Sequence, residues 1–427
     1  MSMIKSTAWN GVAVAFRLSS GLALNKILAV LVGPGGYAII GQFQNAIQIF
    51  YTIAAGSINN GITKYTAEYA GDEARQHALW STAVRIVLFA WVFVAALLVA
   101  FHRPVADYFL GSEQYASIFL WLAVTIGLFS LNTLLLAIVN GKKDLRTFVA
   151  SNIAGSVLIL ISMAALTWFF GLYGALVAVA LHQSLIFFVT IALCRRMPWF
   201  TREALFAPFS GPAALRILSF ATMATASAIA INGGQVMVRG ILIDRLGLAY
   251  AGYWDAMIRI SQLNMLLVTS ATAFYFIPRM SELTYWEDIR HEIWNGCKLI
   301  VPLFVAGALG AYLLRDFVIL ILFTSDFSPM RSLFGWQLAG DTLRVASFFP
   351  AYMLIGKAMI RTYISIELLT NALFAGLSWW LVGRLGFEGV AIAHFIAYAV
   401  AIVLMFLSIR ISRAAPRRAE AASADSG

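Results

Sequence analysis

The first apolar stretch, residues 7–32, reads TAWNGVAVAFRLSSGLALNKILAVLV and poses the problem that the rest of the chain must solve. A helix needs about 20 apolar residues to cross the hydrocarbon core of a bilayer, so this stretch is long enough. It nevertheless carries Arg17 near its middle and Lys26 closer to its far end. A cation at the centre of such a helix costs about 2.5–3.5 kcal/mol on insertion. A partner charge, a water-filled cavity or an anionic ligand is expected to compensate it.

Apolar stretches of similar length recur along the chain and leave little room for a water-soluble fold. Of the 427 residues, 61% are hydrophobic and 12% are charged, whereas a soluble domain carries about 25% charged residues. The stretches are continuous rather than alternating, which excludes a transmembrane β-barrel. We therefore predict an all-α polytopic membrane protein. The net charge of +10 is attributed to cytosolic connections and not to nucleic-acid binding.

Twelve membrane-spanning helices are predicted, joined mostly by short connections. Lys and Arg gather in the connections on one side, for example Lys142 and Lys143, and are sparse on the other, for example Arg103 and Arg384. The positive-inside bias therefore places both termini in the cytosol. The predicted spans are 7–32, 38–62, 80–101, 116–140, 147–170, 172–194, 216–242, 251–276, 295–314, 333–356, 362–384 and 387–410.

The chain also repeats itself at a spacing of about 215 residues, as many transporters do. Gly171-Leu-Tyr-Gly174 matches Gly386-Phe-Glu-Gly389, Leu110-Gly-Ser-Glu113 matches Phe323-Thr-Ser-Asp326, and Thr63-Lys64 matches Pro278-Arg279. Six spans per repeat give both halves the same orientation, which predicts two parallel six-helix lobes around a central cavity. We assign residues 1–200 to the first lobe, 201–412 to the second, and 413–427 to a disordered cytosolic tail.

The repeat gives Lys26 a counterpart in the second lobe. A position about 215 residues after Lys26 lies next to Arg239, which is at matching depth in the first span of that lobe. Two interpretations fit each of these cations: the side chain snorkels to the outer surface, or it faces the cavity. Arg17 lies deeper. It is nine residues from Lys26, which puts the two on opposite helix faces unless Gly21 bends the helix, so whether both reach one cavity stays open.

Acidic residues inside the predicted spans are accompanied by nearby cations. Asp341 and Arg344 are spaced i, i+3, and Asp255 and Arg259 are spaced i, i+4, so each couple can pair on one helix face. Each couple is either a permanent neutral pair or one that breaks as a proton or sodium ion binds. Further candidates are Glu367, which can pair with Arg361, and, as a cytosolic gate at repeat-related span ends, Lys64 and Arg279.

The chain lacks the sequence motifs of ATP hydrolysis and of zinc binding. It contains no G-x-x-x-x-G-K-[ST] sequence, so it carries no P-loop for ATP, and no H-E-x-x-H or zinc-type Cys/His spacing. We predict no cofactor and no metal, and expect a proton or sodium gradient to drive the protein.

Four stretches resemble the polysaccharide repeat-unit flippases of Gram-negative bacteria, the Wzx-type O-antigen and lipid III flippases of the multidrug/oligosaccharidyl-lipid/polysaccharide (MOP) exporter superfamily. They are Gly33-Pro34-Gly35, Asn60-Gly61-Ile62-Thr63-Lys64-Tyr65, Leu333-Phe-Gly-Trp336-Gln337-Leu-Ala-Gly340-Asp341 and Lys357-Ala-Met-Ile-Arg361. The likeness runs through nearly the whole chain.

The resemblance implies a MATE-like fold of twelve spans in two lobes, and alternating access in the bacterial inner membrane. It implies a substrate, an O-antigen-like or enterobacterial-common-antigen-like oligosaccharide on undecaprenyl diphosphate, moved from the cytosolic to the periplasmic leaflet. Basic residues in the first span of each lobe, here Arg17, Lys26 and Arg239, would bind the diphosphate. The expected partners are this glycolipid, membrane lipids, a polysaccharide polymerase and a chain-length regulator, and the expected state is a monomer.

Two other functions remain open from the residues. A multidrug antiporter could share this fold, although its substrates are usually cations and its cavity should favour acids. A membrane glycan transferase or polymerase would need an acid/base pair or a substantial outer loop, and the sequence offers neither.

Overall fold

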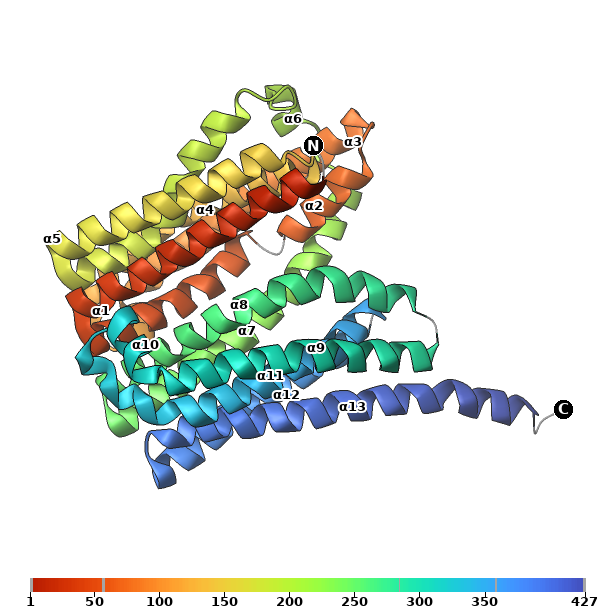
Figure 1. Ribbon diagram of the computed structural model, residues 1–427. Helices are drawn as coiled ribbons and strands as arrows, with labels where there is room; N and C mark the ends of the chain where they lie inside the picture. The colour runs from red at the N-terminus through yellow and green to blue at the C-terminus, as the bar shows by residue number, and fades with distance from the viewer. Residues whose placement is uncertain (1–2, 56–57, 284, 358, 425–427) are drawn as a thin grey trace. The chain divides into compact units, whose positions relative to one another are not determined.

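The computed structural model describes residues 3–55, 58–283, 285–357 and 359–424, and across these ranges the chain forms only helices and connections (Figure 1). The description leaves out the side chains of residues 3–18, 60, 145, 183, 219–224, 226–231, 266–275, 277–278, 281–282, 356, 360 and 409–424. Contacts divide the chain into two compact units, Met1–Val236 and Met237–Gly427, each with its own core.

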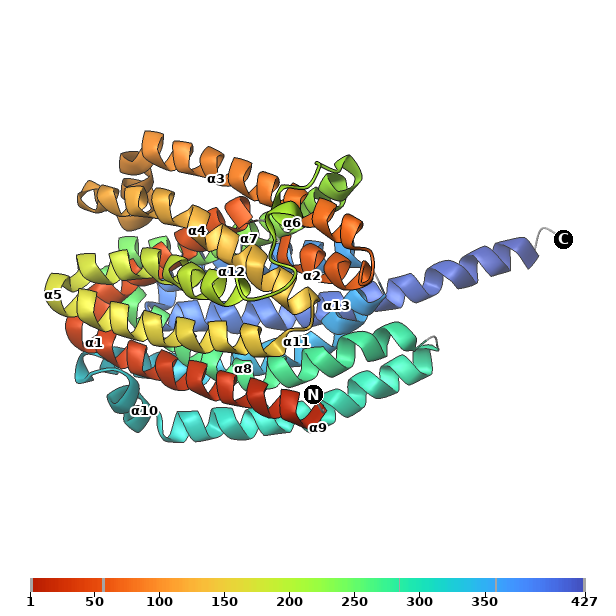
Figure 2. The same ribbon diagram turned by 90° about the horizontal axis from the view of Figure 1, so that it is seen from above.

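The first unit is built on α4, which packs between α3 and α5, while α5 also packs on α1; Figures 1 and 2 show these helices side by side. Phe43 of α1 meets Phe119 of α4 edge to face, with ring centroids 5.5 Å apart. The elements are α1 (Met3–Ala55), α2 (Ile58–Glu68), α3 (Glu73–Leu110), η1 (Glu113–Tyr115), α4 (Ala116–Gly141), α5 (Leu145–Cys194), α6 (Arg202–Phe206) and α7 (Gly211–Leu246), whose last residues belong to the second unit.

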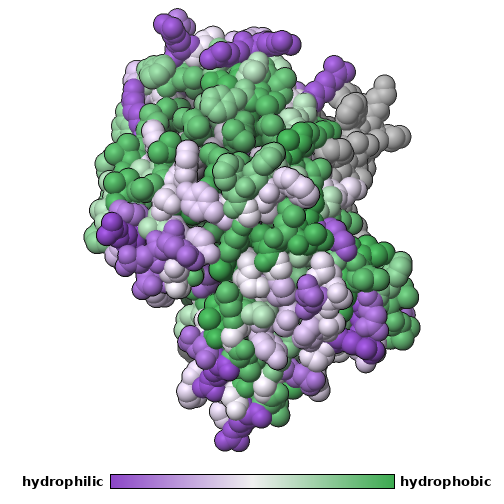
Figure 3. Space-filling view, turned by 90° about the vertical axis from the view of Figure 1, so that its left-hand side faces the viewer, coloured by the Kyte–Doolittle hydropathy of each residue, from purple (hydrophilic) through white to green (hydrophobic). Residues whose placement is uncertain are grey.

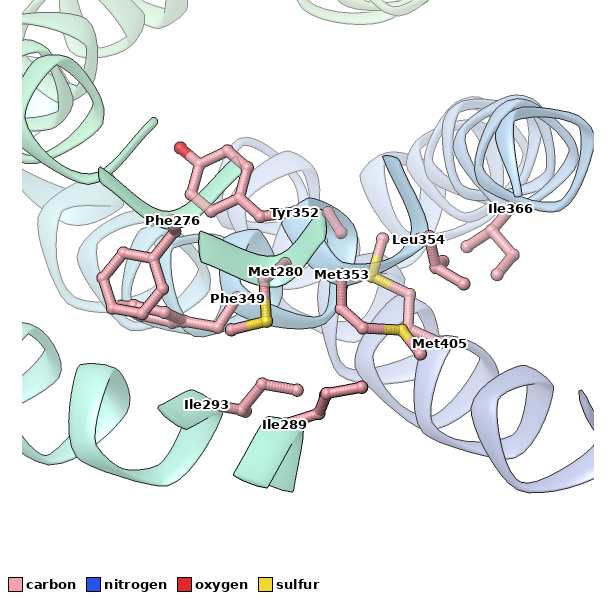
Figure 4. Packing of buried hydrophobic residues seen from close by; sticks show 11 residues of the cluster. Phe276, Met280, Ile289, Ile293, Phe349, Tyr352, Met353, Leu354, Ile366 and Met405 are labelled. Carbon is pink, nitrogen blue, oxygen red and sulfur yellow. The ribbon is translucent and has the colours of Figure 1, made fainter. Parts of the chain in front are cut away.

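The second unit is built on α11, which packs against α8, α9 and α13. Figure 4 shows its apolar core, which contains Ile293 of α9 and Met405 of α13. Phe276 of α8 and Phe349 of α11 meet edge to face in this core, with ring centroids 5.0 Å apart. The elements are α8 (Leu248–Glu282), α9 (Trp286–Leu313), α10 (Arg315–Leu322), η2 (Ser325–Leu333), α11 (Phe334–Gly356), α12 (Ile360–Leu385) and α13 (Glu388–Ala424).

Within the described residues, seven helices are long and apolar enough to cross a membrane. Two of them, Ser19–Ala55 and Arg146–Cys194, each contain a glycine with a non-helical backbone, Gly33 or Gly171, between two predicted spans. The positive φ values of 63° and 55° at these glycines are ones that residues with a side chain rarely adopt. The prediction of an all-helical, multi-pass membrane protein is confirmed.

Large apolar side chains cover much of the surface, as expected where lipid replaces water as the solvent. Figure 3 shows a broad hydrophobic surface on which hydrophilic side chains gather in separate patches. Phe89 of α3 and Phe169 of α5 are 77% and 75% exposed. In water such a surface would aggregate, so the helices bury their faces against one another and present the remainder to the bilayer.

The repeat seen in the sequence has a matching backbone geometry in the two units. Gly171 (φ 55°, ψ −137°) and Gly386 (φ 65°, ψ −142°) adopt nearly the same conformation. Three residues later, a Cβ on Gly174 would lie 1.9 Å from the carbonyl oxygen of Leu166, and one on Gly389 would lie 2.6 Å from that of Leu381. The same two glycines therefore make the same tight turn between consecutive helices in both units.

The boundary between the units differs from the division predicted at residue 200, because the connection after α5 is fastened to α3. Ser210 N donates to Thr82 Oγ1 at 2.9 Å, and Arg85 Nη2 donates to the carbonyl oxygen of Ala207 at 3.0 Å. Contacts therefore group the connection and most of α7 with the first unit. The lobe assignment of residues 201–236 and the disorder of tail 413–427, which overlaps the end of α13, stay predictions.

We predict that Gly386→Ala destabilises the protein and that Gly376→Ala does not. A side chain at the φ and ψ of Gly386 is strained by about 1–3 kcal/mol, whereas Gly376 lies inside α12 with open space around it. Thermal unfolding of the detergent-purified variants measures both effects. Equal melting temperatures for the two variants would contradict the role of this turn.

Candidate functional site

The predicted cations of the first unit lie along the first half of α1. The side chain of Arg17 is outside the described residues, so its direction stays open. Lys26 is half-buried, and its neighbour Asn25 is buried and accepts a hydrogen bond from Tyr37 Oη at 3.0 Å. This bond joins the two halves of α1 across the Gly33 kink and fixes the helix that carries Lys26.

The third predicted cation, Arg239, lies in a buried ion pair with Asp255. The residues are only 3% and 4% exposed. Arg239 Nε donates to Asp255 Oδ2 at 2.9 Å, and Nη2 donates to Oδ1, so the contact is bidentate. The guanidinium also lies over the ring of Trp254, 5.7 Å from its centroid. Charge, hydrogen bonding and aromatic contact all hold Arg239 in place.

This pairing joins two residues for which separate roles are predicted from the sequence. Arg239 was expected to bind diphosphate, and Asp255 to pair with Arg259 one helical turn later. The structure places Arg239 and Asp255 together across the α7–α8 turn, while Arg259 adds a second positive charge to the electrostatic surroundings of Asp255. Asp255 therefore has Arg239 as its hydrogen-bonded partner and Arg259 as a second nearby cation.

A second buried polar group links α11 to α13. Asp341 is fully buried, and its Oδ1 lies 3.0 Å from His394 Nε2 and 3.3 Å from Gln337 Nε2. The expected partner of Asp341, Arg344, instead has its guanidinium 5.5 Å from the centroid of the Tyr398 ring, within electrostatic reach of Asp341 and Glu367. Likewise the cation acting on Glu367 is Arg344 rather than Arg361.

Two acceptor atoms of this group, Asp341 Oδ2 and Gln337 Oε1, are buried without a hydrogen-bond partner among the described residues. A buried carboxylate oxygen without a donor is poorly compensated, because burial removes the water that would otherwise solvate it. Oxygen atoms without donors are also the ligands that a sodium ion would use. The group is therefore chemically able to exchange a small cation.

The predicted gate residues lie at helix ends in their own units. Lys64 of α2 is exposed, with its Nζ 5.2 Å from the centroid of the Tyr65 ring. Arg279 lies in the last turn of α8, where a cation is favoured by the helix dipole. Their role as a gate stays a prediction.

Lys142 and Lys357 make related contacts that are not predicted from the sequence features named above. Lys142 follows α4 and donates to Gln76 Oε1 at 2.6 Å, and Lys357 follows α11 and donates to the carbonyl oxygen of Leu283. The signal was present, because both lysines belong to the pattern G-K-x-x-x-R-T at the repeat spacing: Gly141-Lys142 with Arg146-Thr147, and Gly356-Lys357 with Arg361-Thr362.

Comparison of the structure with solved proteins defines the class of fold. An inward-facing multidrug resistance MATE transporter of the MOP superfamily superposes with a TM-score of 0.79 at 16% identity, covering 95% of this chain and 96% of its own. The lipid II flippase MurJ superposes with a TM-score of 0.74 at 14% identity, covering 95% of this chain and 87% of its own. The fold is that of the MOP transporters.

The sequence comparison narrows this class to a family. The chain belongs to the polysaccharide biosynthesis protein family, whose model matches residues 5–284. It is 28% identical over 400 residues to the lipid III flippases of Escherichia coli (strain K12) and Shigella flexneri, with 94% of this chain and 96% of each relative covered. The resemblance to polysaccharide repeat-unit flippases of the MOP superfamily is confirmed.

We predict that Arg239→Met is strongly destabilising, because it leaves the Asp255 carboxylate buried without its partner. Breaking a buried pair on one side costs about 3–5 kcal/mol. The double variant Arg239→Met/Asp255→Leu should recover most of this loss, since apolar replacement of both partners is close to neutral. Thermal unfolding in detergent measures both.

The exposed pair between Arg331 and Asp316, 3.3 Å apart with side chains 54% and 66% exposed, provides the control. Arg331→Met should change stability by no more than about 1 kcal/mol. A double variant as unstable as Arg239→Met would show that the ion pair does not account for the loss.

Proposed function

We propose that this protein is a flippase that moves oligosaccharides linked to undecaprenyl diphosphate, of the O-antigen or enterobacterial-common-antigen kind, from the cytosolic to the periplasmic leaflet. The observation that carries the proposal is the likeness over 94% of the chain to relatives named lipid III flippases. The fold shared with the lipid II flippase MurJ supports it. The protein is then a transporter of the inner membrane and not an enzyme.

Alternating access requires two halves that can move against each other. We propose twelve spans in two six-helix lobes around a central cavity, with both termini in the cytosol. The matched turns at Gly171 and Gly386 support the two lobes, because they place the same helix connection at the repeat spacing. The one-sided distribution of Lys and Arg in the connections supports the orientation.

The cations of the first span in each lobe are proposed to bind the diphosphate. Lys26 and Arg17 are the contacts in the first lobe, and Arg239 is the contact in the second. Because Arg239 is already held by Asp255, the diphosphate has to replace a carboxylate on the same guanidinium. A diphosphate can do so, since it offers more negative charge and more acceptor oxygens than one carboxylate. A proton on Asp255 would favour the exchange.

The Asp341–His394 group is proposed to couple transport to an ion gradient, together with Arg344 and Glu367. Its support is the burial of Asp341 and the acceptor oxygens that lack donors. A proton is the preferred ion, because the imidazole of His394 lies directly on the carboxylate. Sodium is the alternative. No bound cofactor takes part in this mechanism.

A multidrug antiporter is the second candidate function, and the MATE fold alone does not distinguish it. Buried basic residues favour an anionic substrate, whereas a cationic drug would favour a cavity lined by acids. A glycan transferase or polymerase is disfavoured, because the likeness to flippases covers 94% of the chain. A polymerase and a chain-length regulator remain proposed partners, and a monomer the proposed state.

We predict that Lys26→Ala and the double variant Arg239→Met/Asp255→Leu lose transport while remaining folded. Both remove a cation that the diphosphate needs, and the double variant leaves no unpaired carboxylate behind. Complementation of glycan export in a strain lacking its own flippase measures the effect. The exposed Arg384, whose guanidinium lies over Trp380, serves as the control through Arg384→Ala.

Full complementation by either inserted variant would rule out the diphosphate role of that residue. Altered drug susceptibility without any change in glycan export would favour the antiporter. Covalent change of the lipid-linked substrate by the purified protein would instead indicate a transferase.

Substitution in the second polar group should uncouple the protein from its driving ion. Asp341→Asn and His394→Gln keep hydrogen-bonding groups but cannot take part in the same proton exchange. In proteoliposomes, we expect uphill transport driven by an imposed pH gradient to disappear while downhill movement persists. Glu388→Gln, at an exposed position on α13, is the control. Unchanged uphill transport in both variants would contradict the proposed coupling site.

A further inference from the structure

The pattern G-K-x-x-x-R-T occurs twice, once in each unit. The first copy runs from Gly141 to Thr147 and the second from Gly356 to Thr362, so they agree at four positions without any insertion. Each copy begins where a long helix ends, α4 or α11, and extends into the next helix, α5 or α12. Neither copy lies in the groups proposed to bind diphosphate or the driving ion.

In the first unit, the lysine of the pattern completes a chain of hydrogen bonds between three helices. Lys142 Nζ donates to Gln76 Oε1 at 2.6 Å, and Gln76 Nε2 donates to the carbonyl oxygen of Thr66 at 2.7 Å. The hydroxyl of Thr66 in turn accepts from Trp80 Nε1 at 2.9 Å, and Lys142 Nζ lies 5.2 Å from the centroid of the Trp80 ring. Gln76, Thr66 and Trp80 are buried, so each donor and acceptor here depends on the others.

The glycine of the first copy permits this arrangement. A Cβ on Gly141 would lie 2.6 Å from Thr66 Cβ and 2.9 Å from the carbonyl oxygen of Thr63. Only a residue without a side chain lets the end of α4 approach α2 so closely. Thr63 Oγ1 then donates to the carbonyl oxygen of Ala137 on α4 at 3.1 Å, which adds a second bond across the same contact.

In the second unit, the equivalent lysine, Lys357, binds at the connection between α8 and α9. Lys357 Nζ donates to the carbonyl oxygen of Leu283, the capping residue directly after α8. A cation is favoured there, because it satisfies a carbonyl at a helix C-terminus and opposes the negative end of the helix dipole. Leu283 and Met359, on either side of this bond, both pack against the apolar core that contains Phe349.

The hydrogen bonds of Lys142 and Lys357 connect equivalent parts of the two units, although their acceptors differ. Each lysine leaves the end of the fourth predicted span of its lobe and binds at the connection between the second and third, which is α2–α3 in one unit and α8–α9 in the other. In both hydrogen bonds the acceptor is a neutral oxygen and not a carboxylate. The charge is therefore used to hold helix ends together rather than to neutralise an acid.

We propose that Lys142 and Lys357 are matched positioning residues that fasten neighbouring helix ends at the predicted cytosolic end of each unit. Alternating access needs lobes that keep their own shape while they move. The connections between consecutive helices at this end hold the helices of each lobe in place. Each lysine would keep its lobe moving as one body. The inference rests on the proposed flippase function for its effect on transport, but the fastening itself belongs to each unit separately.

The test combines local exchange and transport. In Lys142→Met we expect faster amide hydrogen exchange in residues 66–78, and in Lys357→Met in residues 279–290, in the purified full chain. Transport of undecaprenyl-diphosphate-linked oligosaccharide extracted from bacterial membranes should slow about tenfold per folded molecule, the size of effect expected when one charged hydrogen bond is lost. The half-saturating substrate concentration should not change. Lys142→Arg and Lys357→Arg should restore both readouts in part.

Two exposed lysines, one in each unit, serve as controls. Lys143 follows Lys142 directly and Lys298 lies on α9, and both are exposed; Lys143→Met and Lys298→Met should leave exchange and transport unchanged. Wild-type exchange in Lys142→Met and Lys357→Met would overturn the proposal. So would a higher half-saturating concentration with unchanged exchange, since the lysines would then be substrate contacts. If the wild-type protein moves no glycolipid, the flippase function fails, and the exchange experiment alone decides whether the lysines fasten the helices.

Discussion

The buried pair between Arg239 and Asp255 shows the constraint that governs the whole chain: inside an apolar structure, each charge has to be compensated by other parts of the protein. Leaving one partner of a buried pair without the other costs about 3–5 kcal/mol. The pair meets this requirement with two hydrogen bonds and an aromatic face. In the proposed mechanism, a substrate anion has to displace Asp255 to reach Arg239. Structural compensation and proposed substrate binding thus compete for one guanidinium.

The second unit meets the same constraint differently around Asp341. Here a histidine and an amide surround the carboxylate, and acceptor oxygens are left without donors among the described residues. Incomplete compensation is unfavourable for stability. It is useful where a small cation has to enter and leave, because the bound ion interacts with the acceptor oxygens that have no donor among the described residues. The two polar groups of this unit are therefore suited to different roles, one to holding and exchanging an anion partner, the other to binding a cation.

Polar contacts at helix ends complement these buried groups. Glycine turns at Gly171 and Gly386 set the direction of successive helices, and the two lysines of the repeated pattern tie neighbouring helix ends together. Helix ends are where backbone carbonyls lack partners, so a cation placed there satisfies a need that the apolar middle of the helix does not have. Both units contain the glycine turn and the lysine at a helix end, although the two lysines donate to different acceptors.

The sequence by itself determined the helical membrane class, the approximate helix positions and the glycine turns of the repeat, because these depend on apolar length and on local backbone conformation. It also carried the motifs that connect the chain to its family. Only the tertiary structure decided the partners of the charges. Spacing rules pointed Asp255 to Arg259 and Asp341 to Arg344, since residues one turn apart share a helix face. The structure gave Arg239 and His394 instead, because the rotation and depth at which each helix packs determine which side chains meet across helices.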